Sequence, residues 1–355
     1  MINLNSYKLD TLPTTKKENL KKQEWSYLYA YNIRTIRDIF VYCVLNGEIE
    51  EKKLYKDMED KKIPPPKGHW INKRRKREER LRLEYIHAAQ YLGLIIREKR
   101  KIRPDFSEFK KEKKAIITEN KNRAFDRKGF SPPFTIKEKR SLLNIILNYE
   151  RARDFLRWFL DFSKFPNSLS FTIEEFKENA KPIYILGKIE KGRKGSQILK
   201  RDIDGKIWAI PEDYLRLSSY VFPSWFLELG IIDKAMVFPE FSIDNKLWRM
   251  YYPLKTKEEK FFKINMLNIL MDTFLAYDQK EQIIWIPYLI YTLAQKYCIS
   301  VDVIKSRLQD IHKTDPAHFY MERIPSHLMR SRLRYKESYI EIDGFYRSHL
   351  KLTRR

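Results

Sequence analysis

The sequence predicts a mainly α-helical chain with short antiparallel β hairpins, an α+β fold divided among several small domains. Hydrophobic residues make up 43% of the 355 residues, which is enough for packed cores. Apolar side chains recur at three- and four-residue spacing in many segments, and two Asp-Gly pairs stand between extended segments, as in hairpins. Ten glycines are too few for a fold built on Gly-rich nucleotide-binding loops. The length predicts two or three domains.

A polar, lysine-rich arm over residues 1–24 is expected to precede an N-terminal domain over 25–165. Leu94-Ile95-Ile96 predicts a strand after Gly93, and the charged segment 97–140, with Gly129 and Pro132-Pro133, predicts an extended connection. Helical periodicity predicts four helices in this domain, at about 24–47, 51–62, 72–92 and 141–162.

After Pro166-Asn167-Ser168 we expect a mixed α+β middle domain over 166–256 and a C-terminal domain over 257–355. The middle domain has extended segments at 183–186, 198–210, 236–238 and 248–252, with Asp204-Gly205 as a hairpin turn. Its helix is expected at 214–229, before Gly230. In the C-terminal domain we expect helices at 257–277, 287–297 and 301–312, then a hairpin at 339–352 around Asp343-Gly344.

The net charge is the most informative quantity in the composition. The chain has 71 Lys and Arg against 47 Asp and Glu, a formal net charge of +24. Such an excess is unfavourable by self-repulsion unless a polyanion neutralises it, and nucleic acid is the commonest such partner. The alternative is that the lysines reflect base composition and serve solubility alone. Because the basic residues cluster, the nucleic-acid interpretation is favoured.

The first basic cluster lies on the helix 72–92 and the segment after it. The apolar face of this helix is expected to carry Leu81, Tyr85, Ala88, Ala89 and Leu92. This helix is followed by Gly93, a short strand and a basic run. The same order is typical of a recognition helix followed by a basic hairpin. The alternative is a solvated charged face. The candidate nucleic-acid-binding residues here are Lys73, Lys76, Arg80, His87, Gln90, Arg97, Arg100, Lys101 and Arg103.

A second cluster follows the helix 301–312, where Arg330, Arg332 and Arg334 are candidates for contacts with the phosphate backbone. This helix is expected to expose Lys305, Gln309 and also Asp302, which phosphate would repel. We therefore expect that it does not enter a groove deeply. A packing or dimerisation role for the C-terminal domain is the alternative.

These two segments resemble winged helix-turn-helix modules, and residues 225–232 are weakly similar to the end of another such module. The resemblance covers about two thirds of the chain. It implies DNA binding without implying a particular family. Tandem modules of this kind occur in prokaryotic regulators, plasmid replication initiators, chromosome-organising complexes and phage-defence systems.

Enzyme chemistry is less well supported than binding. Residues 187–194 resemble a P-loop, but Arg193 stands where the phosphate-binding Lys is required and Lys194 where the hydroxyl is required. We therefore expect Arg193 and Lys194 to form a basic loop against phosphate. The two cysteines and six histidines have no metal-binding spacing, so no catalytic residue, metal ligand or cofactor is assigned.

The predicted function is binding of duplex DNA in the cytoplasm, since neither a signal peptide nor a membrane-spanning segment is recognised. Protein partners or a homodimer are compatible with this prediction. One alternative is an assembly subunit that uses its winged helices for protein docking within a larger DNA-processing complex. The other is a metal-dependent nuclease whose acidic residues are dispersed in the sequence.

Overall fold

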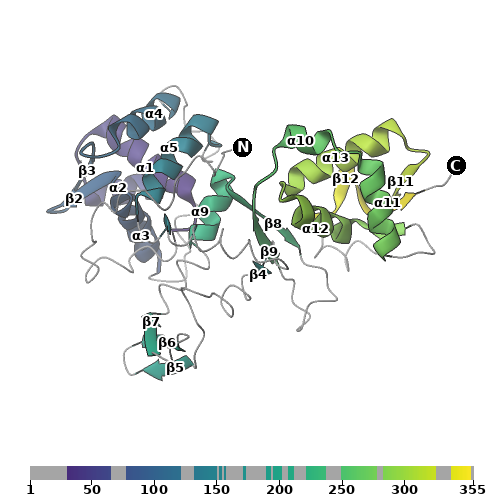
Figure 1. Ribbon diagram of the computed structural model, residues 1–355. Helices are drawn as coiled ribbons and strands as arrows, with labels where there is room; N and C mark the ends of the chain where they lie inside the picture. Colours follow the sequence, from purple (N-terminus) through teal and green to yellow (C-terminus); the bar gives the residue numbers. More distant parts are fainter. Residues whose placement is uncertain are drawn as a thin grey trace. The chain divides into compact units, whose positions relative to one another are not determined.

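The chain folds into helices and small antiparallel sheets, which confirms the predicted α+β class (Figure 1). Its described residues fall into two compact units, one within 30–158 and 181–231 and the other within 159–180 and 232–352. The computed structural model describes residues 30–64, 77–120, 132–149, 152–153, 156, 171–172, 189–192, 195–201, 207–211, 221–236, 249–277, 283–324 and 337–352.

The first unit contains two three-stranded antiparallel sheets, with strand orders β1-β3-β2 and β5-β6-β7. Its helices are α1 (Ile33–Asn46), α2 (Glu51–Glu59), α3 (Arg77–Tyr91), α4 (Lys110–Asn120), α5 (Ile136–Leu147) and α9 (Phe222–Leu229). Its strands are β1 (Ile49–Glu50), β2 (Ile95–Glu98), β3 (Lys101–Pro104), β5 (Ile189–Gly192), β6 (Gly195–Arg201) and β7 (Ile207–Pro211).

Residues 97–140 differ from the extended connection that the sequence predicted, because they contain β3, α4 and the start of α5. The core-facing side of α4 carries Lys113, Ile116 and Asn120, so polar residues hide its apolar periodicity. Helix α5 begins at Ile136 because Thr135 and Glu138 form a capping box, and it ends at Leu147; within the rest of the predicted helix 141–162, residues 152, 153 and 156 are again helical. Pairing of β6 with β7 agrees with the hairpin predicted around Asp204-Gly205, which itself lies outside the described residues.

Helix α1 lies at the centre of the first unit. Asn32 caps it by accepting a hydrogen bond from the Thr35 main-chain nitrogen at 3.1 Å, and its residues from Ile36 to Cys43 are buried. Helix α9 packs against it, with the Trp225 indole donating to the Ala30 carbonyl at 2.7 Å. Helices α3 and α4 also contact α1, so this buried helix positions α3, α4 and α9.

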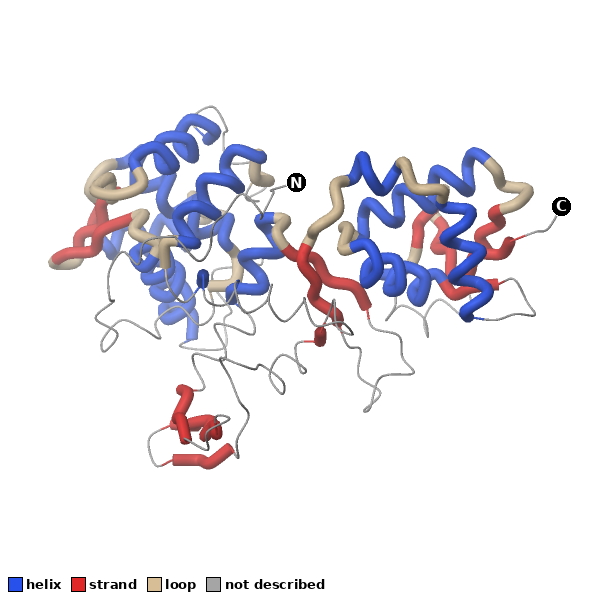
Figure 2. The backbone as a smooth tube through the Cα atoms, viewed as in Figure 1, coloured by secondary structure: helices blue, strands red, loops and turns tan. Residues whose placement is uncertain are grey.

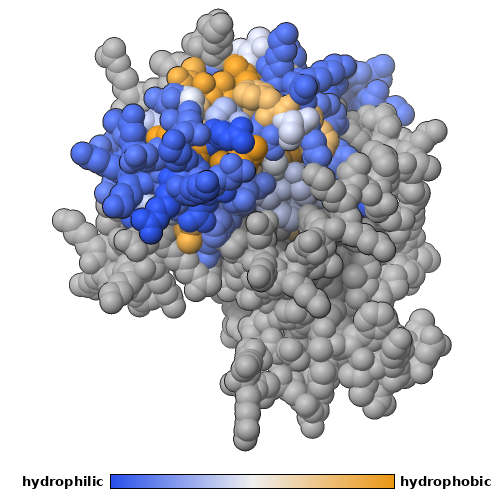
Figure 3. Space-filling view, turned by 90° about the vertical axis from the view of Figure 1, so that its left-hand side faces the viewer, coloured by the Kyte–Doolittle hydropathy of each residue, from blue (hydrophilic) through white to orange (hydrophobic). Residues whose placement is uncertain are grey.

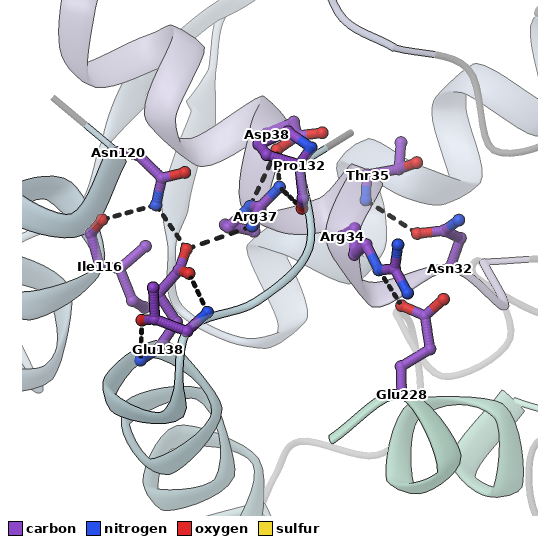
Figure 4. A network of polar contacts seen from close by, with 11 residues as sticks. Asn32, Arg34, Thr35, Arg37, Asp38, Ile116, Asn120, Pro132, Glu138 and Glu228 are labelled. Carbon is purple, nitrogen blue, oxygen red and sulfur yellow. Dashed lines mark hydrogen bonds and ion pairs between the residues drawn. The ribbon is translucent and has the colours of Figure 1, made fainter. Parts of the chain in front are cut away.

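Arg37 is a charged residue in the centre of this core, wholly removed from solvent (Figure 4). Its guanidinium donates to Asp38 Oδ1 at 2.9 Å, to Glu138 Oε1 at 3.2 Å and to the Pro132 carbonyl at 3.0 Å. It also lies 4.9 Å from the centroid of the Phe134 ring. Asn120 of α4 donates to the same Glu138 oxygen at 2.6 Å, so one carboxylate joins α1, α4 and α5.

The second unit has a three-stranded sheet of order β4-β9-β8 and a four-stranded sheet of order β10-β13-β11, with β12 also paired to β13. Its helices are α10 (Glu258–Phe262), α11 (Met266–Tyr277), α12 (Ile286–Tyr297) and α13 (Val301–Thr314). Its strands are β4 (Phe171–Thr172), β8 (Ile232–Met236), β9 (Arg249–Pro253), β10 (Ile283–Trp285), β11 (Phe319–Arg323), β12 (Ile340–Ile342) and β13 (Phe345–Leu352).

The single helix predicted over 257–277 is two helices, α10 and α11, which are separated at residues 263–265. One hydrophobic core joins these helices to α12, α13 and the two sheets. Asp233 of β8 accepts a hydrogen bond from the Val301 main-chain nitrogen at 2.9 Å, and it thereby caps α13. Burial raises the pKa of the Asp233 carboxyl above its ordinary value.

The two units share one order of elements. In the first, α1, β1, α2, α3, β2 and β3 succeed one another; in the second, α11, β10, α12, α13, β11 and β13 do so, with β12 inserted before the last strand. In the order β1-β3-β2 and in the order β10-β13-β11, the strand that comes last in the sequence lies between the other two. The shared strand order shows that the two units repeat one topology, although they share no evident sequence period.

Glu138 tests the importance of the buried charge network. Replacing Glu138 with Ala leaves Arg37 buried without one of its two carboxylates, so we expect the free energy of unfolding to fall by about 3–5 kcal/mol. Glu119→Ala is the matched control, because its ion pair with the exposed Lys137 lies at the surface and contributes at most about 1 kcal/mol. Equilibrium urea unfolding measures both, and equal small losses would show that the network is dispensable.

Candidate nucleic-acid interface

Helix α3 carries the predicted recognition surface. Tyr85, Ala88, Ala89 and Leu92 are buried, as expected for its apolar face, and the Tyr85 hydroxyl accepts a hydrogen bond from the Asn32 main-chain nitrogen at 3.1 Å. His87 and Gln90, on the predicted outward face, are half-buried, and Arg80 lies in the first turn of the helix. The structure therefore places a narrow polar face on α3.

A hairpin of β2 and β3 follows α3 after Gly93 and projects from the helices beside it (Figures 1 and 2). Gly93 has φ +58° where the chain leaves α3, and a Cβ at this position would stand 2.8 Å from the Tyr149 hydroxyl. The backbone conformation therefore favours glycine, and a Cβ here would also displace the Tyr149 hydroxyl. The predicted stop of the helix at Gly93 is confirmed.

The tip of this hairpin has an unusual composition. Glu98 pairs with Lys101, which leaves Lys99 and Arg100 as a two-residue loop, and their φ angles are +46° and +66°. Positive φ at both central positions is the pattern of a type I′ turn, for which Asn-Gly and Asp-Gly are strongly preferred. Both side chains are exposed, and neither has an ion-pair partner within the described residues.

The C-terminal hairpin of β12 and β13 provides a direct comparison. Asp343 and Gly344 form its two-residue loop, with φ +53° and +76°, as the sequence predicted. The same turn geometry is thus built from the preferred pair in one unit and from two cations in the other. Because left-handed backbone costs a side-chain-bearing residue about 1–2 kcal/mol, the Lys99-Arg100 turn is strained.

Three other predicted cations of the hairpin are paired with carboxylates. Lys101 Nζ lies 2.6 Å from Glu48 Oε1, and Arg103 Nη2 lies 3.9 Å from Glu98 Oε2, both in exposed pairs. Exposed pairs of this kind contribute little and exchange partners readily. Arg97 differs, because two of its nitrogens bond to the buried Glu51 and a third lies 3.0 Å from His87 Nε2.

Among the described residues on the side that Figure 3 shows, hydrophilic side chains cover the larger area, with a smaller hydrophobic area above them. Two residues of the candidate interface were not among those that the sequence predicted. Lys99 belongs to the same basic run as its neighbours, and only the turn geometry distinguishes it. Glu51 follows the two-residue strand β1, which is too short for any periodicity to reveal.

Seven of the residues that the sequence predicted to bind nucleic acid lie outside the described residues. These are Lys73, Lys76, Arg193, Lys194, Arg330, Arg332 and Arg334.

Helix α13, the counterpart of α3 in the second unit, has its outward donors already bonded. The Lys305 ammonium donates to the Glu337 carbonyl, and Gln309 Nε2 donates to the Glu341 carbonyl at 2.8 Å. Burial lowers the pKa of Lys305 below its ordinary value. Strand β12 and the residues before it therefore cover part of the face that the sequence predicted to be exposed, while Asp302 remains exposed.

Neither cysteine is an activated nucleophile in the part of the chain that the structure describes. Cys43 and Cys298 are both buried and free, and burial raises the pKa of the Cys43 thiol to about 12, which keeps it protonated at neutral pH. Three or more metal-binding side chains do not gather anywhere among the described residues. None of the described helices combines the length and hydrophobicity that crossing a bilayer requires.

Comparison with protein-family models, with curated proteins and with solved structures finds no match to this chain.

The strain at the hairpin tip can be measured directly. Replacing Lys99 with Asn and Arg100 with Gly supplies the residues that a type I′ turn prefers, so the free energy of unfolding should rise by about 1 kcal/mol. The reverse design at the other hairpin, Asp343→Lys with Gly344→Arg, should destabilise the protein by a similar amount. Thermal unfolding measures both effects, and a loss of stability in the Asn-Gly variant would contradict the assignment.

Proposed function

We propose that the chain binds duplex DNA through a winged-helix module formed by α1–α3 and the β1-β3-β2 sheet. In this proposal α3 faces the major groove and the β2–β3 hairpin is the wing. The observation that carries the proposal is the wing tip, where exposed Lys99 and Arg100 occupy a strained turn without carboxylate partners among the described residues. Strain retained at exposed cations favours a functional role over a structural one.

The topology and the charge support the same proposal. The first module has the order helix, strand, helix, helix and hairpin, and its last strand is central in the sheet. This is the order expected of a winged-helix module. A net charge of +24 provides the long-range attraction to a polyanion that non-specific binding requires. In this proposal the protein acts in the compartment that holds the DNA.

Lys99 and Arg100 should contact phosphates. Changing both to Gln should lower the affinity for a duplex at least about tenfold. It should also reduce the slope of log affinity against log salt by about two, because each lost phosphate contact removes about one released counterion. Fluorescence anisotropy across a salt series measures both quantities.

The matched control is Lys257→Gln with Lys260→Gln, which removes the same charge from exposed positions of the second unit. This control should leave the slope nearly unchanged. If the two double variants behave alike, net charge and not the wing tip accounts for binding.

A second candidate function applies to the C-terminal module, formed by α11–α13 and the sheet of β10, β13, β11 and β12. We propose that it docks a protein partner within a DNA-processing assembly instead of reading a groove. The observation that favours docking is that Lys305 and Gln309 are bonded to the chain's own carbonyls, while Asp302 repels phosphate from the same helix.

The division of roles between the two modules has a measurable consequence. Lys305→Ala with Gln309→Ala removes two donors that are already satisfied within the protein, so duplex affinity should stay within about twofold of the native value. Circular dichroism establishes that the variant is folded, and anisotropy measures its affinity. A tenfold loss in a folded variant would show that α13 contacts the duplex.

A further inference from the structure

Three side chains from separate elements form one connected polar group, here called the Glu51–Arg97–His87 triad. Glu51 begins α2, Arg97 lies in β2, and His87 lies in α3. Arg97 Nε donates to Glu51 Oε2 at 3.1 Å, and Arg97 Nη2 donates to Glu51 Oε1 at 2.8 Å. This is the bidentate geometry in which a guanidinium is held most firmly.

Glu51 holds the wing at two points. Besides its carboxylate on Arg97, its main-chain nitrogen donates to the Arg100 carbonyl at 2.8 Å, at the hairpin tip. The Tyr55 hydroxyl donates to Glu51 Oε1 at 2.6 Å from the next turn of α2. Burial, together with this hydrogen bond, raises the pKa of the Tyr55 hydroxyl, so it stays a donor at neutral pH. The carboxylate is thus oriented from its own helix.

The third nitrogen of Arg97 determines the state of His87. Arg97 Nη1 lies 3.0 Å from His87 Nε2, and a guanidinium can only donate hydrogen bonds. Nε2 must therefore accept, which requires a neutral imidazole with its proton on Nδ1. A proton on Nε2 would face the guanidinium directly. Among the described residues, Glu51 neutralises Arg97, and Arg82 lies over the Tyr55 ring.

We propose that Arg97 is a positioning residue of the wing and not a phosphate ligand. This inference rests on the proposed function, because it assigns roles within that interface. Three of the five N–H donors of Arg97, one on each nitrogen, are bonded within the protein, so the guanidinium is held by Glu51 and His87 and is not directed at a phosphate. It holds the hairpin at a fixed orientation to α3 and keeps His87 in one tautomer on the outward face of that helix.

Glu51→Gln distinguishes the two roles by the sign of its effect. If Arg97 is a phosphate ligand, removing Glu51 frees it and removes a repelling charge, so duplex affinity rises. If Arg97 is a positioning residue, the wing loses its orientation, and affinity falls at least about fivefold. Glu98→Gln is the matched control, because it removes the same charge from an exposed site on the wing itself. The duplex affinity of the Glu98→Gln variant should stay equal to that of the native protein or rise.

A readout on the free protein is independent of DNA. Nitrogen-15 NMR of the imidazole should show native His87 as the Nδ1–H tautomer near neutral pH. Arg97→Lys keeps the charge but lacks the fork that holds Glu51 and His87 together, so the tautomers should mix and affinity should fall with an unchanged salt slope. Circular dichroism checks that each variant is folded, and Arg97→Lys serves if Glu51→Gln does not fold.

The outcomes separate the inference from the proposed function. A rise in affinity on Glu51→Gln, an Nε2–H tautomer in native His87, or a salt slope that drops by about one in Arg97→Lys overturns the positioning role. Each of these can occur while the native protein still binds duplex DNA. If instead the native protein binds no duplex at all but His87 shows the Nδ1–H tautomer, the proposed function fails and the triad geometry stands.

Discussion

The buried guanidinium of Arg37 is the interaction on which the first unit depends. A charge removed from water must be compensated by partners in fixed positions, and Arg37 obtains them from its own helix, from α5 and from the main chain at Pro132. Glu138 serves α5 as a capping residue through one oxygen and Arg37 and Asn120 through the other. Since α1 also contacts α3, the proposed recognition helix rests on a core whose geometry this network specifies.

The two hairpin turns show how function and stability compete within one backbone shape. Both two-residue loops have positive φ at each position, yet one has Asp-Gly and the other Lys-Arg. Asp-Gly satisfies the geometry at little cost, whereas Lys-Arg is strained and places two cations beyond the sheet. A solvated basic surface would not require strain, because lysines on any exposed helix face supply the same net charge. The strained turn therefore points to a position-specific role for its side chains.

Repetition of one topology in the two units does not imply repetition of one role. In the first unit the turn cations stand without carboxylate partners among the described residues, and the polar face of α3 is linked to the wing through the Glu51–Arg97–His87 triad. In the second unit, β12 and the residues before it cover the outward donors of α13. The same order of helices and strands thus carries exposed turn cations in one module and outward donors bonded to the chain's own carbonyls in the other.

The sequence alone determined the helices with strong apolar periodicity, the stop at Gly93, the Asp343-Gly344 turn and the basic charge, because each follows from local residue preferences or from composition. It did not reveal α4, where a buried lysine interrupts the periodicity, or β1, which has only two residues. The candidate cations were recognised as a run, but their individual states were not. Arg97 and Arg100 look alike in sequence, yet one is held by Glu51, 46 residues away, and the other is exposed. Only the tertiary structure decided this difference, because an ion pair across that separation depends on how α2 packs beside the hairpin and not on any local pattern.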